Sequence, residues 1–174
     1  LFWDRVNLWN MLSNRIDFQY AGVNPCGEET LPAGGSCLLG SINLSAFVYD
    51  GTFHFDELDE CVYTAVDALN EVLDEGCNLH PLQYQQESVR NWRQIGLGIM
   101  GLADCLVKLD YRYGSDESLN FCDKLGFRIT FDAIQESCKL AKQHGPYPRY
   151  NHLMLATEFF EAAIPTTTQL YKDV

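Results

Sequence analysis

A stretch rich in glycine and proline between residues 24 and 40 most constrains how this chain of 174 residues can fold. The residues that break regular structure within it are Pro25, Gly27, Pro32, Gly34 and Gly35. Glycine and proline there exclude a regular helix or a central strand. A structureless loop of this length is expected in a compact domain only where it is functional. The stretch therefore predicts a functional loop around which the flanking elements are organised.

Two cysteines and two polar side chains in this loop form a candidate site. Cys26 and Cys37 lie eleven positions apart, and Asn24 and Glu28 lie two positions before and after Cys26. In an extended segment, alternate residues point to the same side. The spacing therefore predicts that an amide, a thiol and a carboxylate face one small volume, which suits a substrate with several hydroxyls.

Three chemistries are open to Cys26. A thiolate nucleophile needs a base such as histidine, and all four histidines lie more than 25 positions away. A metal site is not indicated, because His54, His80, His144 and His152 have no ligand spacing with the cysteines. In radical chemistry the thiol stays neutral and gives up a hydrogen atom, which a nearby carboxylate does not hinder. The loop favours the third possibility.

Composition excludes several classes of protein. The net charge of −12 argues against a nucleic-acid surface, although free nucleotides can be held by backbone amides. The seven cysteines are an odd number and widely spread, so a secreted disulfide framework is not expected and a reducing, cytoplasmic setting fits better. The sequence has no run of about 18 apolar residues, so a membrane span is not expected. No secretion signal is seen.

Apolar periodicity predicts a chain dominated by helices, which by itself indicates an α or α+β fold. We expect helices over residues 1–12, 56–75, 102–109, 115–144 and 151–163. Asp56, Ser115 and Thr166 are candidate N-caps, and Gly76 and Gly145 are candidate helix ends. Residues 18–23 are expected to enter a strand, 41–49 to form a strand or short helix, 50–51 a turn, and 81–90 a loop with one helical turn.

A G-x-G-x-x-G motif at Gly96, Gly98 and Gly101 resembles a dinucleotide fingerprint. Such a fingerprint follows a buried strand and has an acidic residue about 20 positions further on. Only residues 92–95 can precede it as a strand, and a long helix follows. We therefore expect the glycines to allow close packing at a strand-to-helix junction rather than to bind a dinucleotide.

Four blocks of the sequence resemble the ribonucleotide reductase large chain. NPCGE at residues 24–28 and GSCLLGSINLSAFV at 35–48 are similar to its active-site loop, and the blocks at 95–118 and 141–151 are similar to segments that follow. The eleven-residue separation of the two loop cysteines resembles the adenosylcobalamin-dependent class II branch. Metal-dependent class I large chains are the alternative, and many of them have other residues around the first cysteine and a longer insertion.

The resemblance carries implications for the fold. It implies an α/β fold, in which the chain is a helix-rich fragment of a ten-stranded α/β barrel with the active-site cysteine on a loop. Residues 1–174 are then a single segment from the centre of the catalytic domain, with both flanks missing. We expect such a fragment to be inactive by itself.

The resemblance also implies roles for the loop residues. Cys26 matches the cysteine that becomes a transient thiyl radical and takes the hydrogen from C3′ of a ribonucleotide. Glu28 matches the carboxylate that accepts the 3′-hydroxyl proton, and Asn24 matches the amide that orients the sugar. Cys37 matches one cysteine of the redox-active disulfide, whose partner would lie before Leu1. The cysteines at 61, 77, 105, 122 and 138 match no functional position, and we expect them to be structural.

The same resemblance implies the partners of the full-length protein. These are adenosylcobalamin as cofactor, a ribonucleotide as substrate, a thioredoxin-like or dithiol reductant, and a second copy in a homodimer; the product would serve DNA synthesis. No nucleic acid, membrane or bound metal is expected. Two other classes stay open: a nucleotide-binding module built on residues 96–101, and a non-catalytic helical interaction domain.

Overall fold

Helices and strands both contribute to the architecture. The computed structural model describes residues 1–27, 29–36, 38–152 and 157–164. The helices are α1 (Trp3–Leu8), the 3₁₀ helix η1 (Leu44–Phe47), α2 (Phe55–Cys77), α3 (Gln83–Trp92), α4 (Leu102–Lys108), α5 (Asp116–His144) and α6 (Glu158–Ala163). The strands are β1 (Tyr20–Val23), β2 (Thr30–Pro32), β3 (Leu39–Asn43), β4 (Val48–Tyr49), β5 (Thr52–Phe53) and β6 (Gly96–Met100). The expected mixture of helices and strands is confirmed.

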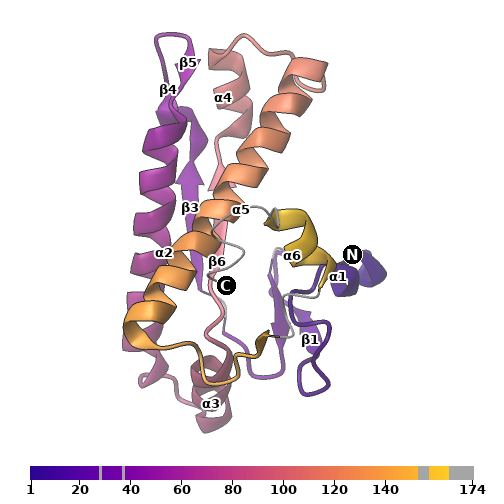
Figure 1. Cartoon of the computed structure of the whole chain (residues 1–174), viewed down its shortest axis with the longest axis vertical. Coiled ribbons are helices and arrows are strands. Elements are labelled where there is room, and N and C mark those ends of the chain that lie inside the picture. The colour runs from indigo at the N-terminus through magenta and orange to yellow at the C-terminus, as the bar shows by residue number, and fades with distance from the viewer. Residues whose placement is uncertain (28, 37, 153–156, 165–174) are drawn as a thin grey trace.

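The strands of the described residues form three two-stranded sheets and no closed barrel. β1 pairs antiparallel with β2, β4 pairs antiparallel with β5, and β3 pairs parallel with β6. Figure 1 shows β3 and β6 side by side, with α2 along β3 and α5 running across them. Strand β1 and helices α1 and α6 form a second group to the right in this view.

The parallel pair β3–β6 is central to the larger group. Leu39 pairs with Gly96 and Asn43 with Met100. Parallel neighbours need a long crossover, which the segment containing α2 and α3 provides. Residues of α2 that are spaced three or four positions apart are buried, as expected for a helix that covers a sheet. They are Leu58, Val62, Val66, Leu69, Leu73 and Cys77.

Both predicted ends of the second helix are wrong by one or two residues. α2 begins at Phe55 after His54, whose side chain makes no capping hydrogen bond, so Asp56 lies inside the first turn. Gly76 also lies inside the helix, which ends at Cys77. Acidic side chains in the first turn favour the helix without capping it, since they interact with the positive end of its dipole.

The predictions for α5 hold at both ends. The Oγ atom of Ser115 accepts a hydrogen bond of 3.3 Å from the Ser118 amide, and Gly145 ends the helix with a φ of 87°. The buried face of α5 includes Phe121 and Leu125, whereas Leu119 is 56% exposed.

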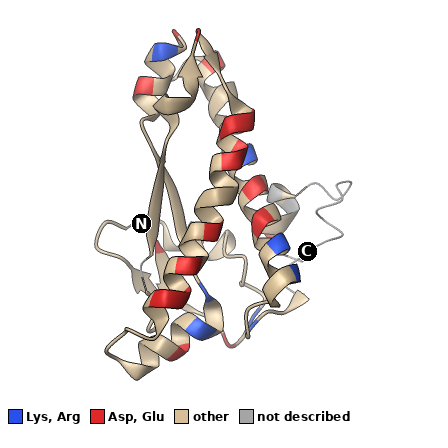
Figure 2. Ribbon diagram, turned by 90° about the vertical axis from the view of Figure 1, so that its left-hand side faces the viewer, with Lys and Arg blue, Asp and Glu red and all other residues tan. Residues whose placement is uncertain are grey.

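Acidic side chains are buried between α2 and α5. Asp132 of α5 is 4% exposed and accepts a hydrogen bond of 3.1 Å from the Tyr63 hydroxyl of α2. Arg128 forms a salt bridge with Asp59 and donates to its Oδ1 atom over 3.1 Å. Burial raises the pKa of Asp132 to about 6, and the nearby Asp59 carboxylate adds to this rise. Figure 2 shows that other acidic residues are spaced along the surface of α2.

The remaining differences from the sequence prediction concern element boundaries. Residues 1–12 form a helix only over Trp3–Leu8, none of whose residues is buried. Residues 81–90 belong mostly to the ten-residue helix α3 rather than to a loop. Residues 41–49 contain the end of β3, η1 and β4, and the described part of the last predicted helix contains α6 at Glu158–Ala163. Thr166 lies outside the described residues.

The turn predicted at residues 50–51 is confirmed. Asp50 and Gly51 have φ values of 52° and 69° and join β4 to β5, as a two-residue hairpin turn requires. The hairpin packs its buried residues, Val48 and Phe53, into the main core with Leu58 and Leu106. A separate cluster of Leu12, Phe18, Phe160 and Ile164 anchors the second group of elements.

Candidate active site

Cys26 lies in a tight turn between β1 and β2. The Gly27 amide donates a hydrogen bond of 3.0 Å to the Asn24 carbonyl, and Gly27 has a φ of 81°. Asparagine first, proline second and glycine fourth is the residue order that a β-turn favours. The prediction of an extended segment here is therefore wrong, and the order N-P-C-G is the signal that indicates the turn.

Asn24 fixes the base of this turn. The Asn24 side chain is 7% exposed, and its Oδ1 atom accepts a hydrogen bond of 2.9 Å from the Glu29 amide. The Asn24 amide donates to the Glu29 carbonyl over 3.1 Å. Asn24 and Glu29 thus close the loop, while Cys26 at its tip is an exposed free thiol. An exposed sulfur held by a closed turn is accessible to a reaction partner.

The structure places two of the four predicted site residues. Asn24 and Cys26 belong to one turn, in which Asn24 is buried and the Cys26 thiol is exposed. Glu28 and Cys37 lie outside the described residues. Both carboxylate oxygens of the neighbouring Glu29, which sequence analysis does not single out, are buried.

The loop between Ala33 and Ser36 is held by α3 and the turn before it. The Ser36 Oγ and His80 Nε2 atoms are 2.5 Å apart, and the Ser88 hydroxyl donates to the Ala33 carbonyl over 3.3 Å. The Tyr84 ring covers Gly34, where a Cβ would be 2.9 Å from Tyr84 Cδ2. Sequence reasoning misses these partners because residues 81–90 read as a loop. They fix the segment that directly precedes Cys37 in the chain.

The G-x-G-x-x-G motif occupies a strand rather than the turn after one. Gly96 and Gly98 are part of β6, and Gly101 is the N-cap of α4 with a φ of 72°. A dinucleotide fingerprint instead has its first glycine at the end of a strand. A Cβ at Gly101 would overlap the Asn43 Oδ1 atom of β3. The motif therefore packs the junction closely, as expected, although the strand begins at Gly96 and not before it.

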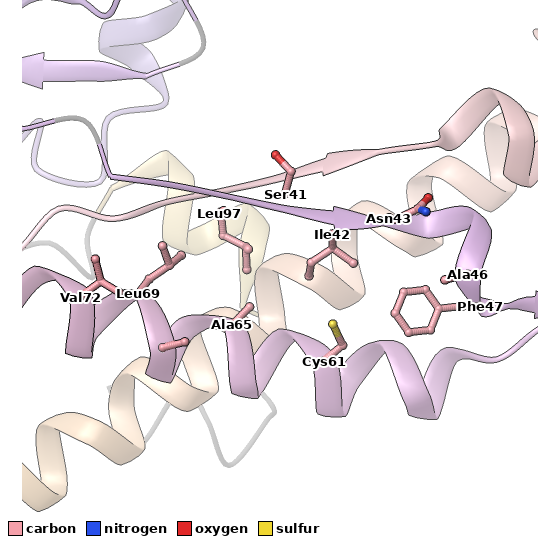
Figure 3. Close-up of a pocket in the computed structure, with 12 residues that line it drawn as sticks. Ser41, Ile42, Asn43, Ala46, Phe47, Cys61, Ala65, Leu69, Val72 and Leu97 are labelled. Atoms are coloured by element: carbon pink, nitrogen blue, oxygen red, sulfur yellow. The ribbon is translucent and has the colours of Figure 1, made fainter.

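An apolar groove of about 440 Å³ lies between α2 and β3. Figure 3 shows its lining, which includes Ile42, Cys61, Ala65, Leu69 and Val72. Neither Asn24 nor Cys26 lines this groove. It offers few polar groups to a substrate with several hydroxyls, so it is not the candidate site.

The five cysteines beyond the loop are all free thiols. Cys105 is fully buried, and burial raises the pKa of its thiol to about 11. Such a thiol is inert near neutral pH, since the thiolate is the reactive form. In the described part of the chain, no cluster of three His, Cys, Asp or Glu side chains could hold a metal ion. Nor does any helix in that part have the length and apolarity needed to cross a bilayer.

Comparison with known proteins identifies the family of the chain. Residues 1–169 match the family described as ribonucleotide reductase, barrel domain. A vitamin B12-dependent ribonucleoside-diphosphate reductase of Thermoplasma acidophilum is 37% identical over 171 residues, which are 98% of this chain and 22% of that protein. A protein of the same name from Mycobacterium tuberculosis is 37% identical over 150 residues, covering 86% of this chain and 21% of the relative.

A third relative bears a different name. The ribonucleoside-diphosphate reductase subunit alpha of Chlamydia muridarum is 40% identical over 114 residues, which are 66% of this chain and 11% of that protein. The chain thus spans about a fifth or less of the length of these relatives. The match covers nearly the whole chain and includes both loop blocks. The chain belongs to the ribonucleotide reductase barrel domain family.

Proposed function

We propose that this chain is the part of a ribonucleotide reductase that carries the radical cysteine. The full-length protein would reduce ribonucleoside diphosphates to 2′-deoxyribonucleotides for DNA synthesis, with adenosylcobalamin as cofactor. Membership of the family and the names of the two relatives from Thermoplasma and Mycobacterium support this. The observation that carries the proposal is Cys26, an exposed thiol at the tip of a turn that Asn24 closes.

Cys26 is assigned the first chemical step. As a thiyl radical, its sulfur takes the hydrogen atom from C3′ of the ribose, which forms an S–H bond and leaves a carbon radical. The same hydrogen returns to C3′ at the end, so the cysteine is regenerated. Adenosylcobalamin, when bound, supplies the initiating radical. Exposure of Cys26 fits a radical that is delivered from outside this segment.

Glu28 and Asn24 are assigned the proton transfer and the orientation of the sugar. Glu28 accepts the proton of the 3′-hydroxyl, a general-base role, and the 2′-hydroxyl then leaves as water. Asn24 orients the hydroxyls. Its Oδ1 atom is already bonded to the Glu29 amide, which supports a fixed orientation of the amide plane.

Cys37 is assigned the supply of electrons. Together with a second cysteine from another part of the full-length protein, it gives two electrons and two hydrogens and becomes a disulfide. A thioredoxin-like protein or another dithiol then reduces the disulfide by thiol exchange, so that each product formed consumes one external dithiol. The hydrogen bonds of Ser36 and Ser88 support a fixed path for the chain before Cys37.

Further proposals concern the full-length protein as a whole. We expect residues 1–174 to be a single segment within its catalytic barrel, and the protein to be a cytoplasmic homodimer. The free thiols of the described residues support a reducing compartment. Sedimentation of the full-length protein would test the dimer, since a monomer at micromolar concentration contradicts it.

The proposed function is tested with the full-length protein under anaerobic conditions. Ribonucleoside diphosphate and a dithiol are supplied with and without adenosylcobalamin. We expect deoxynucleotide only with the cobalamin, and none from a Cys26→Ser variant. Product formation by Cys26→Ser equal to that of the unaltered protein would contradict the assignment.

A second candidate keeps the reaction and changes the source of the radical. The Chlamydia relative is named as a subunit alpha, and its similarity supports an enzyme that depends on a second subunit. Activity that ignores cobalamin and needs a separate metal-containing protein would favour this class I alternative. Inactivity of a well-folded protein under both conditions would favour a helical interaction domain instead.

A further inference from the structure

The first glycine of the G-x-G-x-x-G motif lies against the loop that carries Cys26. A Cβ atom at Gly96 would be 2.5 Å from Glu29 Oε1, 3.0 Å from Glu29 Cδ and 3.0 Å from Leu39 Cδ2. The first of these distances is too short for a real side chain, so any other residue at this position must displace the end of the Glu29 side chain. Glycine inside a strand often marks such a close approach. Gly96 is therefore explained by the room it leaves for Glu29.

Glu29 is in turn fastened to the turn that presents Cys26. The Glu29 amide and carbonyl make hydrogen bonds of 2.9 Å and 3.1 Å with the side chain and amide of Asn24. Both carboxylate oxygens of Glu29 are buried. A buried carboxylate is costly to place, so its surroundings rather than solvent determine where it sits.

The partner strand of β6 completes this connection. The Gly96 amide donates a hydrogen bond of 2.8 Å to the Leu38 carbonyl, which fixes the start of β6 beside β3. A rigid strand therefore lies beneath the Glu29 carboxylate. A shift of the Glu29 backbone away from β6 would move Asn24 and the turn with it, because the Glu29 backbone and Asn24 are joined by two hydrogen bonds.

We propose that Glu29 and Gly96 are positioning residues for Cys26. The Glu29 carboxylate occupies the space above Gly96. Its contact with Gly96 determines how far the turn lies from β6, and therefore where the Cys26 thiol lies. This inference rests on the proposed function of Cys26 and extends it to two residues that have no assigned role. It also gives the G-x-G-x-x-G motif a function in loop placement.

The test compares two glycine substitutions in the same strand of the full-length protein. Gly96→Ala puts a methyl group against Glu29, whereas a Cβ at Gly98 meets nothing nearer than 3.7 Å. A displacement of about 1 Å at a reacting group can cost about a hundredfold in rate. We expect Gly96→Ala to lower kcat by about a hundredfold, with the KM for the nucleotide changed by less than about threefold. Gly98→Ala should change both by less than about threefold.

A second substitution tests whether the loss acts through Glu29. Glu29→Ala alone should lower kcat by about tenfold, because the turn loses the contact of the Glu29 side chain with β6. It also vacates the space that the methyl group introduced by Gly96→Ala needs. The double variant Gly96→Ala with Glu29→Ala should therefore lose about tenfold, and not the product of the two single losses.

Alkylation of Cys26 by iodoacetamide gives a readout that does not need activity. We expect Gly96→Ala to raise the rate of Cys26 alkylation above that of Gly98→Ala, with Cys26→Ser identifying the labelled site. Equal kcat and equal alkylation in the two glycine variants, or losses that multiply in the double variant, would overturn the proposal. A fully active Cys26→Ser protein would instead remove the proposed function, and the alkylation rates would still show whether Glu29 and Gly96 place the turn.

Discussion

Replacing Asp132 by asparagine should make the contact between α2 and α5 insensitive to pH. Asp132 is 4% exposed, and its Oδ2 atom is buried without a donor among the described residues. The Asp59 carboxylate is close enough to raise the pKa of Asp132 further. Asp59 is paired with Arg128 and stays ionised, so Asp132 must be protonated to donate a hydrogen bond to it. The folded state therefore favours the protonated acid.

The size and sign of the effect follow from the pKa. Burial raises the pKa of Asp132 from 3.8 to about 6 in the folded protein. One pKa unit corresponds to about 1.4 kcal/mol, so ionisation costs the folded state up to about 3 kcal/mol. The stabilisation is complete below pH 4, the ordinary range of an aspartic acid, and is lost as the pH rises through about 6. Asparagine keeps the shape and has no proton to lose.

Hydrogen exchange of the full-length protein measures this effect locally. The free energy of opening of the α5 amides should fall by up to about 3 kcal/mol between pH 4 and pH 8 in the unaltered protein, after correction for the intrinsic exchange rate. It should stay nearly constant in Asp132→Asn. The exposed Asp123 of the same helix provides the control, and Asp123→Asn should follow the unaltered protein. Parallel curves for Asp132→Asn and the unaltered protein would refute the reasoning.

Three further predictions concern packing and thiol chemistry. Leu58→Ala removes a fully buried side chain and should destabilise the protein by about 2–5 kcal/mol in denaturant unfolding, whereas Val107→Ala at a 77% exposed site should cost less than about 0.5 kcal/mol. Gly101→Ala forces alanine to a φ of 72° and should lower the melting temperature, and an unchanged value would contradict the strain. Iodoacetamide at pH 8 should modify Cys26 long before Cys105, since burial raises the pKa of Cys105 to about 11, and comparable rates by mass spectrometry would contradict this.

Local sequence signals predict where most helices begin and end, but they do not predict which distant residues these elements contact. The hydroxyl at Ser115 and the glycine at 145 define α5 correctly, because caps act within one turn of a helix. The helix α3 is missed, since most of its residues are polar and it is held by contacts with residues 33–36 and with α2, which are separate elements. Burial of Asp132 is missed for the same reason: a charged residue reads as exposed until its partners on another helix are known.

The candidate site likewise has local features that the sequence indicates and long-range contacts that only the structure reveals. The residue order N-P-C-G indicates the turn, but the prediction of an extended segment at residues 24–28 overlooks it. The glycine at 96 reads as part of a cofactor motif, and only the three-dimensional structure brings it beside Glu29. Sequence similarity is the basis of the chemistry proposed for Cys26, whereas the residues proposed to hold it in place depend on contacts between separate elements.

The central claim, that Cys26 exchanges a hydrogen atom with C3′ of the substrate, is tested most directly with a nucleotide deuterated at that carbon. The full-length protein is supplied with adenosylcobalamin and a dithiol, and product formation is compared for the labelled and unlabelled substrates. We predict slower reduction of the deuterated substrate, recovery of the deuterium at C3′ of the product, and no product from Cys26→Ser. Equal rates for the two substrates together with an active Cys26→Ser variant would contradict the account.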